Sequence, residues 1–202
     1  MAQVGIKTAY VRVDDQVLEL DHSFLGVNKA DIKGIEPNVG EIDGSNETQA
    51  YYFEGTGKSS IALTVNQLGM EWIAKITGMQ KAGSGNLFVL GDRPADVGII
   101  VVSPEFGTKK DAVFAMDKAA AAYSSANLST STSSKTNVVA DVITFNGISS
   151  DKFNGKSIGI GEYDSGSTDF LTELGWGTPT KGSGNYTDDS SSSSVIKPGG
   201  AH

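Results

Sequence analysis

The sequence predicts a mainly β protein: an antiparallel β-sandwich or partly closed barrel with one flanking α-helix over about residues 68–77. Three observations support this prediction. Glycine makes up 25 of the 202 residues and recurs beside Asn, Asp and Ser, so turn signals follow one another about every 8–15 residues, as in all-β domains. Between the turns lie short runs of alternating apolar and polar residues, which is the period of a half-buried strand. A helical period is clear in one segment.

Eight segments are candidate strands, and they follow one another through most of the chain. In chain order they are IKTAYVRVD, QVLEL, DIKGIEP, SSIALTVN, NLFVLG, DVGIIVVS, VVADVITFNGI and KSIGIGEY. In SSIALTVN, Ile61, Leu63 and Val65 alternate with smaller or polar residues, as expected of a strand with one buried face. DVGIIVVS is apolar on both faces, so we expect it in the centre of the fold, buried on two sides.

The segment NQLGMEWIAKITGM predicts the helix, because Trp72, Ile73 and Ile76 fall on one helical face. Asn66 is a candidate cap at its start and Gly78 a candidate cap at its end. The segment follows a strand directly, so we expect the helix to fold back over one open face of the sheet. Trp72 would be its packing anchor, with Ile73 and Ile76 beside it.

Two segments are less clearly patterned. The alanines of DAVFAMDKAAAAYSSA, Asp111 to Ala126, favour a helix, whereas the neighbouring segments are β and Ser-rich. From Gly182 onward, GSGNYTDDSSSSSVIKPGGAH has too few apolar residues to order itself by burial. We therefore expect one β-domain over residues 1–178 and a flexible Ser/Gly-rich tail over residues 179–202.

Composition excludes several classes of protein. The absence of cysteine excludes a disulfide scaffold, thiolate catalysis and cysteine-ligated zinc. The N-terminus lacks a basic region followed by an apolar run, and no segment approaches the roughly 18 apolar residues of a membrane helix, so we expect a soluble protein made in the cytoplasm. A net charge of −8 with only two arginines, Arg12 and Arg93, opposes tight binding to nucleic acid.

The stretch YYFEGTGKSSIAL contains Gly-Thr-Gly-Lys-Ser and superficially matches a phosphate-binding loop. Such a loop needs a glycine before four spacer residues and the Gly-Lys pair, and Tyr52 occupies that position here. It must also lead into a helix, whose N-terminus holds the anion. A strand-like run follows Lys58 instead, so we predict a β-hairpin turn and no nucleotide site.

No constellation for catalysis, cofactor binding or metal binding stands out. The chain has two histidines, His22 and the terminal His202, which leaves no general base with a recognisable partner. The carboxylates do not have the spacing of a calcium-binding loop. Trp176, which could stack on a sugar, is expected to close the core. We predict no enzyme and no cofactor, and a secreted carbohydrate-binding or adhesin-like β-sandwich is the alternative class.

The order of segments resembles the major tail proteins, or tail tube proteins, of long-tailed bacteriophages. The likeness rests on AQVGIKTAYVRV, on GIEPNVGEIDGSNETQAYYFEGTGKSSIALTVNQLGMEWIAKITGM, and on NVVADVITFNGISSDKFNGKSIGIGEYDSGSTDFL. It covers about residues 1–178 and is one of arrangement rather than of a sharp motif. The resemblance implies a β-sandwich or partly closed barrel with one helix, and it favours a strand over residues 111–126.

The resemblance also implies a function. Six copies would form a ring, and rings would stack into a hollow tube in the virion tail, together with tape measure, tail terminator and distal tail proteins. Genomic DNA would pass through the lumen without specific binding. The acidic charge suits this role, because a lumen of the same sign repels the phosphates of DNA.

The segment Val39–Lys58 is the candidate assembly loop. Its core, GEIDGSNETQ, is too polar for the protein interior and too long for a tight turn. We expect an extended hairpin or loop whose strand pairing continues beyond the subunit. Its charged residues are Glu41, Asp43, Glu47, Glu54 and Lys58. Because the carboxylates of like subunits would repel one another there, assembly is expected to depend on ionic strength.

Overall fold

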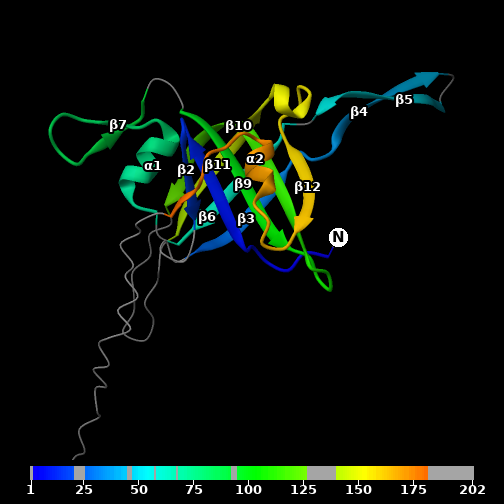
Figure 1. Ribbon diagram of the computed structural model, residues 1–202. Helices are drawn as coiled ribbons and strands as arrows, with labels where there is room; N and C mark the ends of the chain where they lie inside the picture. The colour runs from blue at the N-terminus through cyan, green and yellow to red at the C-terminus, as the bar shows by residue number, and fades with distance from the viewer. Residues whose placement is uncertain are drawn as a thin grey trace, which may run out of the picture.

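The computed structural model describes residues 2–20, 26–44, 47–56, 58–66, 68–91, 95–126 and 140–181. Figure 1 shows a body of strands flanked by helices, from which a two-stranded hairpin projects. The predicted mainly β class is confirmed. No helix within the described ranges is long and apolar enough to span a membrane.

Nine strands form one sheet. They are β1 (Thr8–Val13), β2 (Gln16–Leu20), β3 (Val27–Lys33), β6 (Ser60–Val65), β9 (Asp96–Pro104), β10 (Lys110–Ala126), β11 (Asp141–Ile148), β12 (Gly159–Asp164) and β13 (Thr180–Lys181). Their order is β13-β2-β1-β9-β10-β11-β6-β3, and β12 also pairs with β10. All pairs are antiparallel except β13 with β2. Because the two end strands do not pair with each other, the sheet is a partly closed barrel rather than a closed one.

The alanine-rich segment is a strand, β10, as the resemblance favoured. Its 17 residues pair with β9 along one side, and with β12 and then β11 along the other. Asp111 through Asp117 are all buried. Small alanine side chains fit in β10, because other strands flank it on both sides and the two hydrophobic cores cover its faces for much of its length. Tertiary pairing therefore overrides the helical propensity of alanine.

Strand β9 lies at the centre of the fold, as predicted. It is paired with β1 on one side and β10 on the other. Ile99 and Val101 face the larger core, and Ile100 and Val102 face a second, smaller core on the other side of the sheet. The continuous apolar run DVGIIVVS thus reflects burial of both faces.

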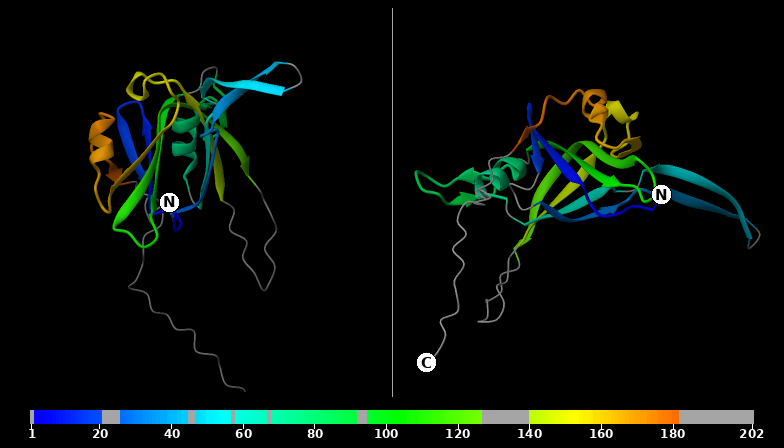
Figure 2. Two further views of the ribbon diagram at one scale, coloured as in Figure 1. Left: turned by 90° about the vertical axis from the view of Figure 1, so that its right-hand side faces the viewer. Right: turned by 60° about the horizontal axis from the view of Figure 1, so that its bottom comes forward.

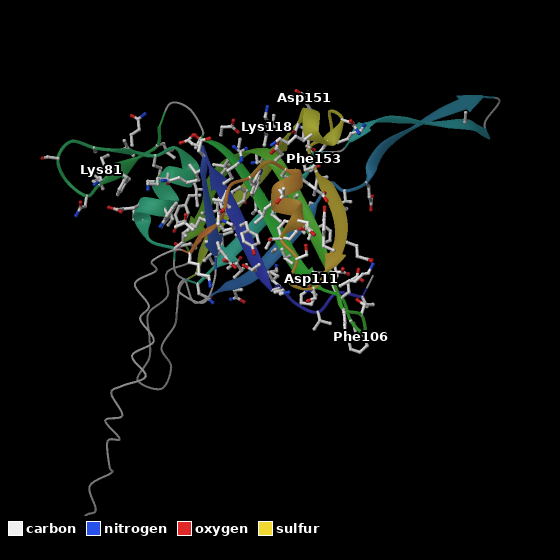
Figure 3. The ribbon with its side chains drawn as sticks, in the orientation of Figure 1. Lys81, Phe106, Asp111, Lys118, Asp151 and Phe153 are labelled. Atoms are coloured by element: carbon white, nitrogen blue, oxygen red, sulfur yellow. The ribbon has the colours of Figure 1, made fainter. Side chains whose placement is uncertain are left out.

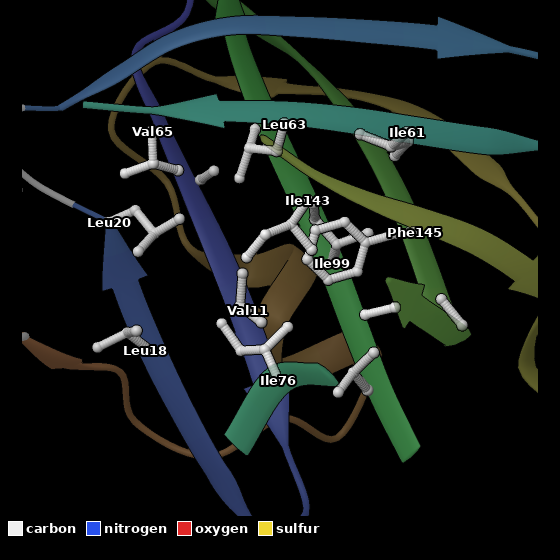
Figure 4. Packing of buried hydrophobic residues seen from close by; sticks show 14 of the residues in the cluster. Val11, Leu18, Leu20, Ile61, Leu63, Val65, Ile76, Ile99, Ile143 and Phe145 are labelled. Carbon is white, nitrogen blue, oxygen red and sulfur yellow. The ribbon is translucent and has the colours of Figure 1, made fainter. Parts of the chain in front are cut away.

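The larger core fills the concave side of the curled sheet. Figure 4 shows side chains of β1 and β2, among them Val11 and Leu20, pointing toward Leu63 of β6 and Phe145 of β11. Strands at opposite ends of the sheet order therefore share one core. This contact across the curl, rather than a second stacked sheet, closes the interior.

Helix α1 (Met70–Thr77) covers one end of the larger core. It begins later than predicted, and Gly69, not Asn66, is its N-cap residue, without a side-chain hydrogen bond. The predicted C-cap is confirmed: Gly78 adopts φ 72°, and its N–H bonds the carbonyl of Ala74, as left-handed helix ends require. Ile73 and Ile76 are buried.

The prediction of one flanking helix was incomplete. A second helix, α2 (Asp169–Glu173), and a 3-10 turn, η2 (Asp151–Phe153), cover the other face of the sheet. Phe170 and Leu171 of α2 pack on Tyr10 and Ile100 in the smaller core. With only five residues, α2 is too short to show a helical period in the sequence.

Two small hairpins stand apart from the main sheet. Strands β4 (Pro37–Gly44) and β5 (Glu47–Thr56) form one of them, and β7 (Gln80–Lys81) and β8 (Phe88–Val89) form the other. Strand β13 extends the ordered fold slightly past the expected domain boundary at residue 178. The rest of the expected tail, residues 182–202, lies outside the described residues.

Candidate interaction surface

The β4–β5 hairpin projects from the body as an arm, which all three views show (Figures 1 and 2). Its strands pair antiparallel from Pro37 opposite Thr56 to Gly44 opposite Glu47, with two register shifts. The two strands form a sheet of their own. Two-stranded ribbons leave backbone N–H and C=O groups unpaired along their outer edges, and such edges can accept a further strand.

The residues of the predicted assembly loop are gathered on this arm. Glu41 and Asp43 lie in β4, Glu47 and Glu54 lie in β5, and Lys58 follows β5 and is exposed. The segment therefore carries four acidic residues against one basic residue. The expected extended hairpin is present, and its sequence gives it a negative formal charge.

The root of the arm is fixed to the body by Ser59. This residue is buried, its hydroxyl donates to the carbonyl oxygen of Gly34 over 3.1 Å, and the same hydroxyl lies 2.8 Å from that of Ser157. The N–H of Gly147 donates to the Ser59 carbonyl over 2.9 Å. Both chain ends of the arm, near Gly34 and Ser59, are thus joined to each other and to the β11–β12 region.

A close backbone approach explains why glycine occupies position 34. Gly34 has φ 70°, and a Cβ placed on it would lie 2.4 Å from the carbonyl oxygen of Lys58. Only glycine satisfies both conditions without strain. The sequence did not identify Ser59 as important, although its position between a glycine-rich turn and an alternating strand was a usable signal.

The run after Lys58 is strand β6, as predicted. It pairs with β11 on one side and β3 on the other. The helix N-terminus that a phosphate-binding loop requires is therefore replaced here by a sheet strand. Gly57 lies outside the described residues.

Asp117 is the centre of a buried polar cluster that the sequence did not predict. Its carboxylate accepts hydrogen bonds from Ser150 Oγ over 2.6 Å, Lys152 Nζ over 3.0 Å and Trp176 Nε1 over 3.2 Å. Burial alone raises the pKa of Asp117, but these three hydrogen bonds outweigh burial and hold the pKa below its usual range. The cluster fastens η2 and the segment after α2 to the central strand β10.

A β-bulge places Asp117 there. Between Met116 and Ala119, β10 has one more residue than β9, and bulges of this kind redirect a side chain. Arg12 completes the cluster, since its Nη2 donates to the Asp117 carbonyl over 2.7 Å and its guanidinium lies 5.5 Å from the centre of the Trp176 ring. The sequence signal for this site was an aspartate inside an apolar and alanine-rich strand, because a buried charge needs partners.

The predicted anchors of α1 differ in exposure. Ile73 and Ile76 are buried, whereas Trp72 is partly buried and packs at the margin of the larger core. The Lys75 ammonium lies 4.7 Å from the centre of the Trp72 ring, a cation–π distance. Trp176, by contrast, is buried in the smaller core, as expected.

Within the described ranges, no group of three or more His, Asp or Glu side chains is placed to hold a metal ion. His22 and His202 lie outside those ranges. The features that stand out are an acidic arm with a fixed root and the outer edges of the sheets. These features suit contacts between protein chains.

A family model described as phage tail tube protein matches residues 1–174. No curated protein and no solved structure matches the chain. The matched region takes in α1, α2 and every strand of the main sheet except β13.

Proposed function

Because the chain belongs to the phage tail tube protein family, we propose that it is the repeating subunit of a bacteriophage tail tube. Six copies form a ring, and rings stack into a hollow conduit through which the genome is delivered. The observation that carries this proposal is the family match over residues 1–174. Family membership favours a structural role in the virion over the carbohydrate-binding alternative and over an enzyme.

The β4–β5 arm is the segment that we assign to contacts between copies. It extends away from the body, and its two strands have unpaired outer edges that a neighbouring chain can extend. A contact between two different surfaces of identical subunits closes into rings or continues as a filament. An arm on one side of each subunit and its receptor on another side would supply such a contact.

The charge of the chain fits a conduit for DNA. Each copy has a formal net charge of −8, and a ring of identical copies multiplies it. Acidic walls repel phosphate groups, so that DNA slides past without adhering. The other tail proteins that the tube meets are the tape measure protein inside it and the terminator and distal tail proteins at its ends.

Electron microscopy of the purified protein tests this proposal. Negatively stained samples prepared over a series of ionic strengths should contain rings or tubes of uniform diameter, and more of them as salt screens the acidic arms. Samples with only monomers or irregular aggregates at every ionic strength would overturn the proposal.

A further inference from the structure

The turn between β9 and β10 presents an exposed aromatic side chain at one end of the body. Phe106 is 75% exposed. Its backbone is held firmly, because the Phe106 N–H donates to the Ala2 carbonyl over 2.7 Å and the Glu105 N–H donates to the Lys110 carbonyl over 3.0 Å. Gly107, with φ 77°, makes the turn. We call residues 105–110 the Phe106 tip.

Phe106 has an exposed apolar neighbour. The N–H of Val4 donates to the carbonyl of Pro104 over 2.9 Å, which fixes Val4 beside the start of the tip. Val4 is itself more than half exposed. A single exposed apolar residue needs no explanation. Val4 and Phe106, however, are two exposed apolar residues that backbone hydrogen bonds hold at the same end of the body.

A half-open pocket lies between β10, β12, η2 and α2, and its lining is polar and apolar in nearly equal measure. Its volume is about 300 Å³, roughly twice that of a cavity that holds a benzene ring. The Phe153 ring covers Gly159 of β12, and the Tyr163 ring covers Gly161. The apolar residues that line it are Val113, Ala115, Phe153, Ile160, Phe170 and Leu174. We call it the β12 pocket.

The Phe106 tip and the β12 pocket are separated along the body. Figure 3 shows Phe106 at its lower end and Phe153, which lines the pocket, at its upper end. Phe106 therefore does not fill the pocket of its own chain, and a contact between the two features joins two copies head to tail. Contacts of this type propagate from copy to copy.

We propose that Phe106 of one copy inserts into the β12 pocket of the next copy in the tube. The inference rests on the proposed function, because it needs a second copy of this chain as the partner. Charges agree with the pairing. Lys109 on the tip takes part in none of the ion pairs among the described residues. At the pocket, Lys152 is already paired with Asp117, whereas the Glu173 carboxylate accepts only from the neutral Tyr163 hydroxyl, over 2.7 Å, among the hydrogen bonds of the described residues. Docking would bring these opposite charges near each other.

Single-cysteine variants test the contact directly, because the chain has no cysteine of its own. Thr108→Cys on the tip, which leaves Phe106 in place, and Glu173→Cys at the pocket, carrying tags of different mass, are mixed, assembled and oxidised. Thr108 and Glu173 are both exposed, so their replacement leaves the core intact. The mixture should give the mixed disulfide in assembled material. Thr108→Cys mixed with Leu90→Cys, an exposed position that follows β8, is the matched control, and mixed disulfides in equal yield from both mixtures would overturn the contact.

Truncation of the aromatic ring gives a second measurement. Phe106→Ala should raise the protein concentration needed for tube formation by about tenfold or more, with an unchanged melting temperature. Leu90→Ala, which removes an equally exposed apolar side chain elsewhere, should not. Normal assembly of Phe106→Ala would overturn the contact and leave the tube function standing. Absence of tubes from the unmodified protein at every ionic strength would overturn both.

Discussion

Trp176 lies directly against Gly98 in the central strand β9. A Cβ built on Gly98 would come 2.4 Å from the Cζ2 atom of the Trp176 ring and 2.7 Å from the Asp117 carbonyl oxygen. The indole therefore covers the backbone of β9 at the one position where that strand has no side chain. This contact, together with the hydrogen bond from Trp176 to Asp117, attaches the segment after α2 to the middle of the sheet.

Gly98→Ala is expected to destabilise the fold by about 1–3 kcal/mol, because the added methyl group forces the indole or the bulged strand to move. Chemical denaturation followed by circular dichroism measures the change. Gly85→Ala is the control, since a Cβ at Gly85 meets nothing within 4 Å. Equal stability of the two variants would show that Trp176 is not held against β9.

Asp117→Asn should lower stability by about 1–3 kcal/mol near neutral pH, because Lys152 and Ser150 lose the buried charge to which they bond. The pKa of Asp117 is lower in the folded chain than in the unfolded chain. The carboxylate therefore contributes stability above about pH 4, and this contribution is lost as the pH falls through the folded value. Between neutral and acid pH, the melting temperature of Asp117→Asn should fall less than that of the unmodified protein. Replacement of the exposed Asp15 by Asn is the control, and parallel pH profiles for the two variants would contradict the prediction.

Stability should also decline in alkali between about pH 10 and 12. Burial raises the pKa of Tyr163 to about 12, with the Glu173 carboxylate acting in the same direction, and burial beside Glu19 raises that of Tyr10 to about 12. A tyrosine whose pKa is higher in the folded chain than in the unfolded chain contributes stability at pH values below the unfolded pKa of about 10. This contribution is lost as the pH rises through the folded pKa of about 12. In an ultraviolet titration, the unmodified protein should have one more tyrosine that ionises near pH 12 than the Tyr163→Phe variant has. If every tyrosine of the unmodified protein ionised near pH 10, the raised pKa would be refuted.

On α1, Ile76→Ala should cost about 2–5 kcal/mol, because its side chain is fully buried and truncation leaves a cavity. Trp72→Ala should cost less, since part of its ring is exposed. Denaturation midpoints of the two variants and of Glu71→Ala, an exposed position on the same helix, give the ranking. A larger loss for Trp72→Ala would make Trp72 the principal anchor after all.

Deletion of residues 43–49 should abolish tubes in electron micrographs while leaving the melting of the monomer nearly unchanged. The deletion removes the turn end of the arm but not its root at Ser59 and Gly34. Removal of Gly83–Gly85 from the β7–β8 hairpin is the control and should not prevent assembly. Tubes of normal length from the first deletion would place the contact elsewhere on the subunit.

The strands with strong periodicity could be predicted from the sequence. Alternation identified β6 and a continuous apolar run identified β9, because the burial of one face or of both faces determines which positions of a strand are apolar. Strand β10 could not be assigned from local propensity, since its conformation depends on pairing with β9, β11 and β12. The resemblance, not the alanines, indicated a strand there.

The polar cluster around Asp117 is a feature that could not be predicted from the sequence. Arg12 and Asp117 are separated by 105 positions, and Ser150, Lys152 and Trp176 come from other segments again. No spacing rule connects residues that meet only after the sheet has formed. The arm was predictable as a polar segment that is too long for a turn, but the hydrogen bonds that fix its root depend on Ser157, which is distant in sequence.

The fixed root of the β4–β5 arm has a consequence for the thermodynamics of docking. A segment tethered by flexible chain ends loses much conformational entropy when a partner captures it, and this loss weakens binding. The bonds among Ser59, Gly34 and Ser157 restrict where the arm starts before any partner arrives. Part of the conformational entropy of the arm is therefore lost when the chain folds, and not when the arm binds a partner. Ser59→Ala removes the hydroxyl bonds of the root and keeps the backbone bond from Gly147; by loosening the root without touching the arm itself, it would weaken association chiefly through entropy.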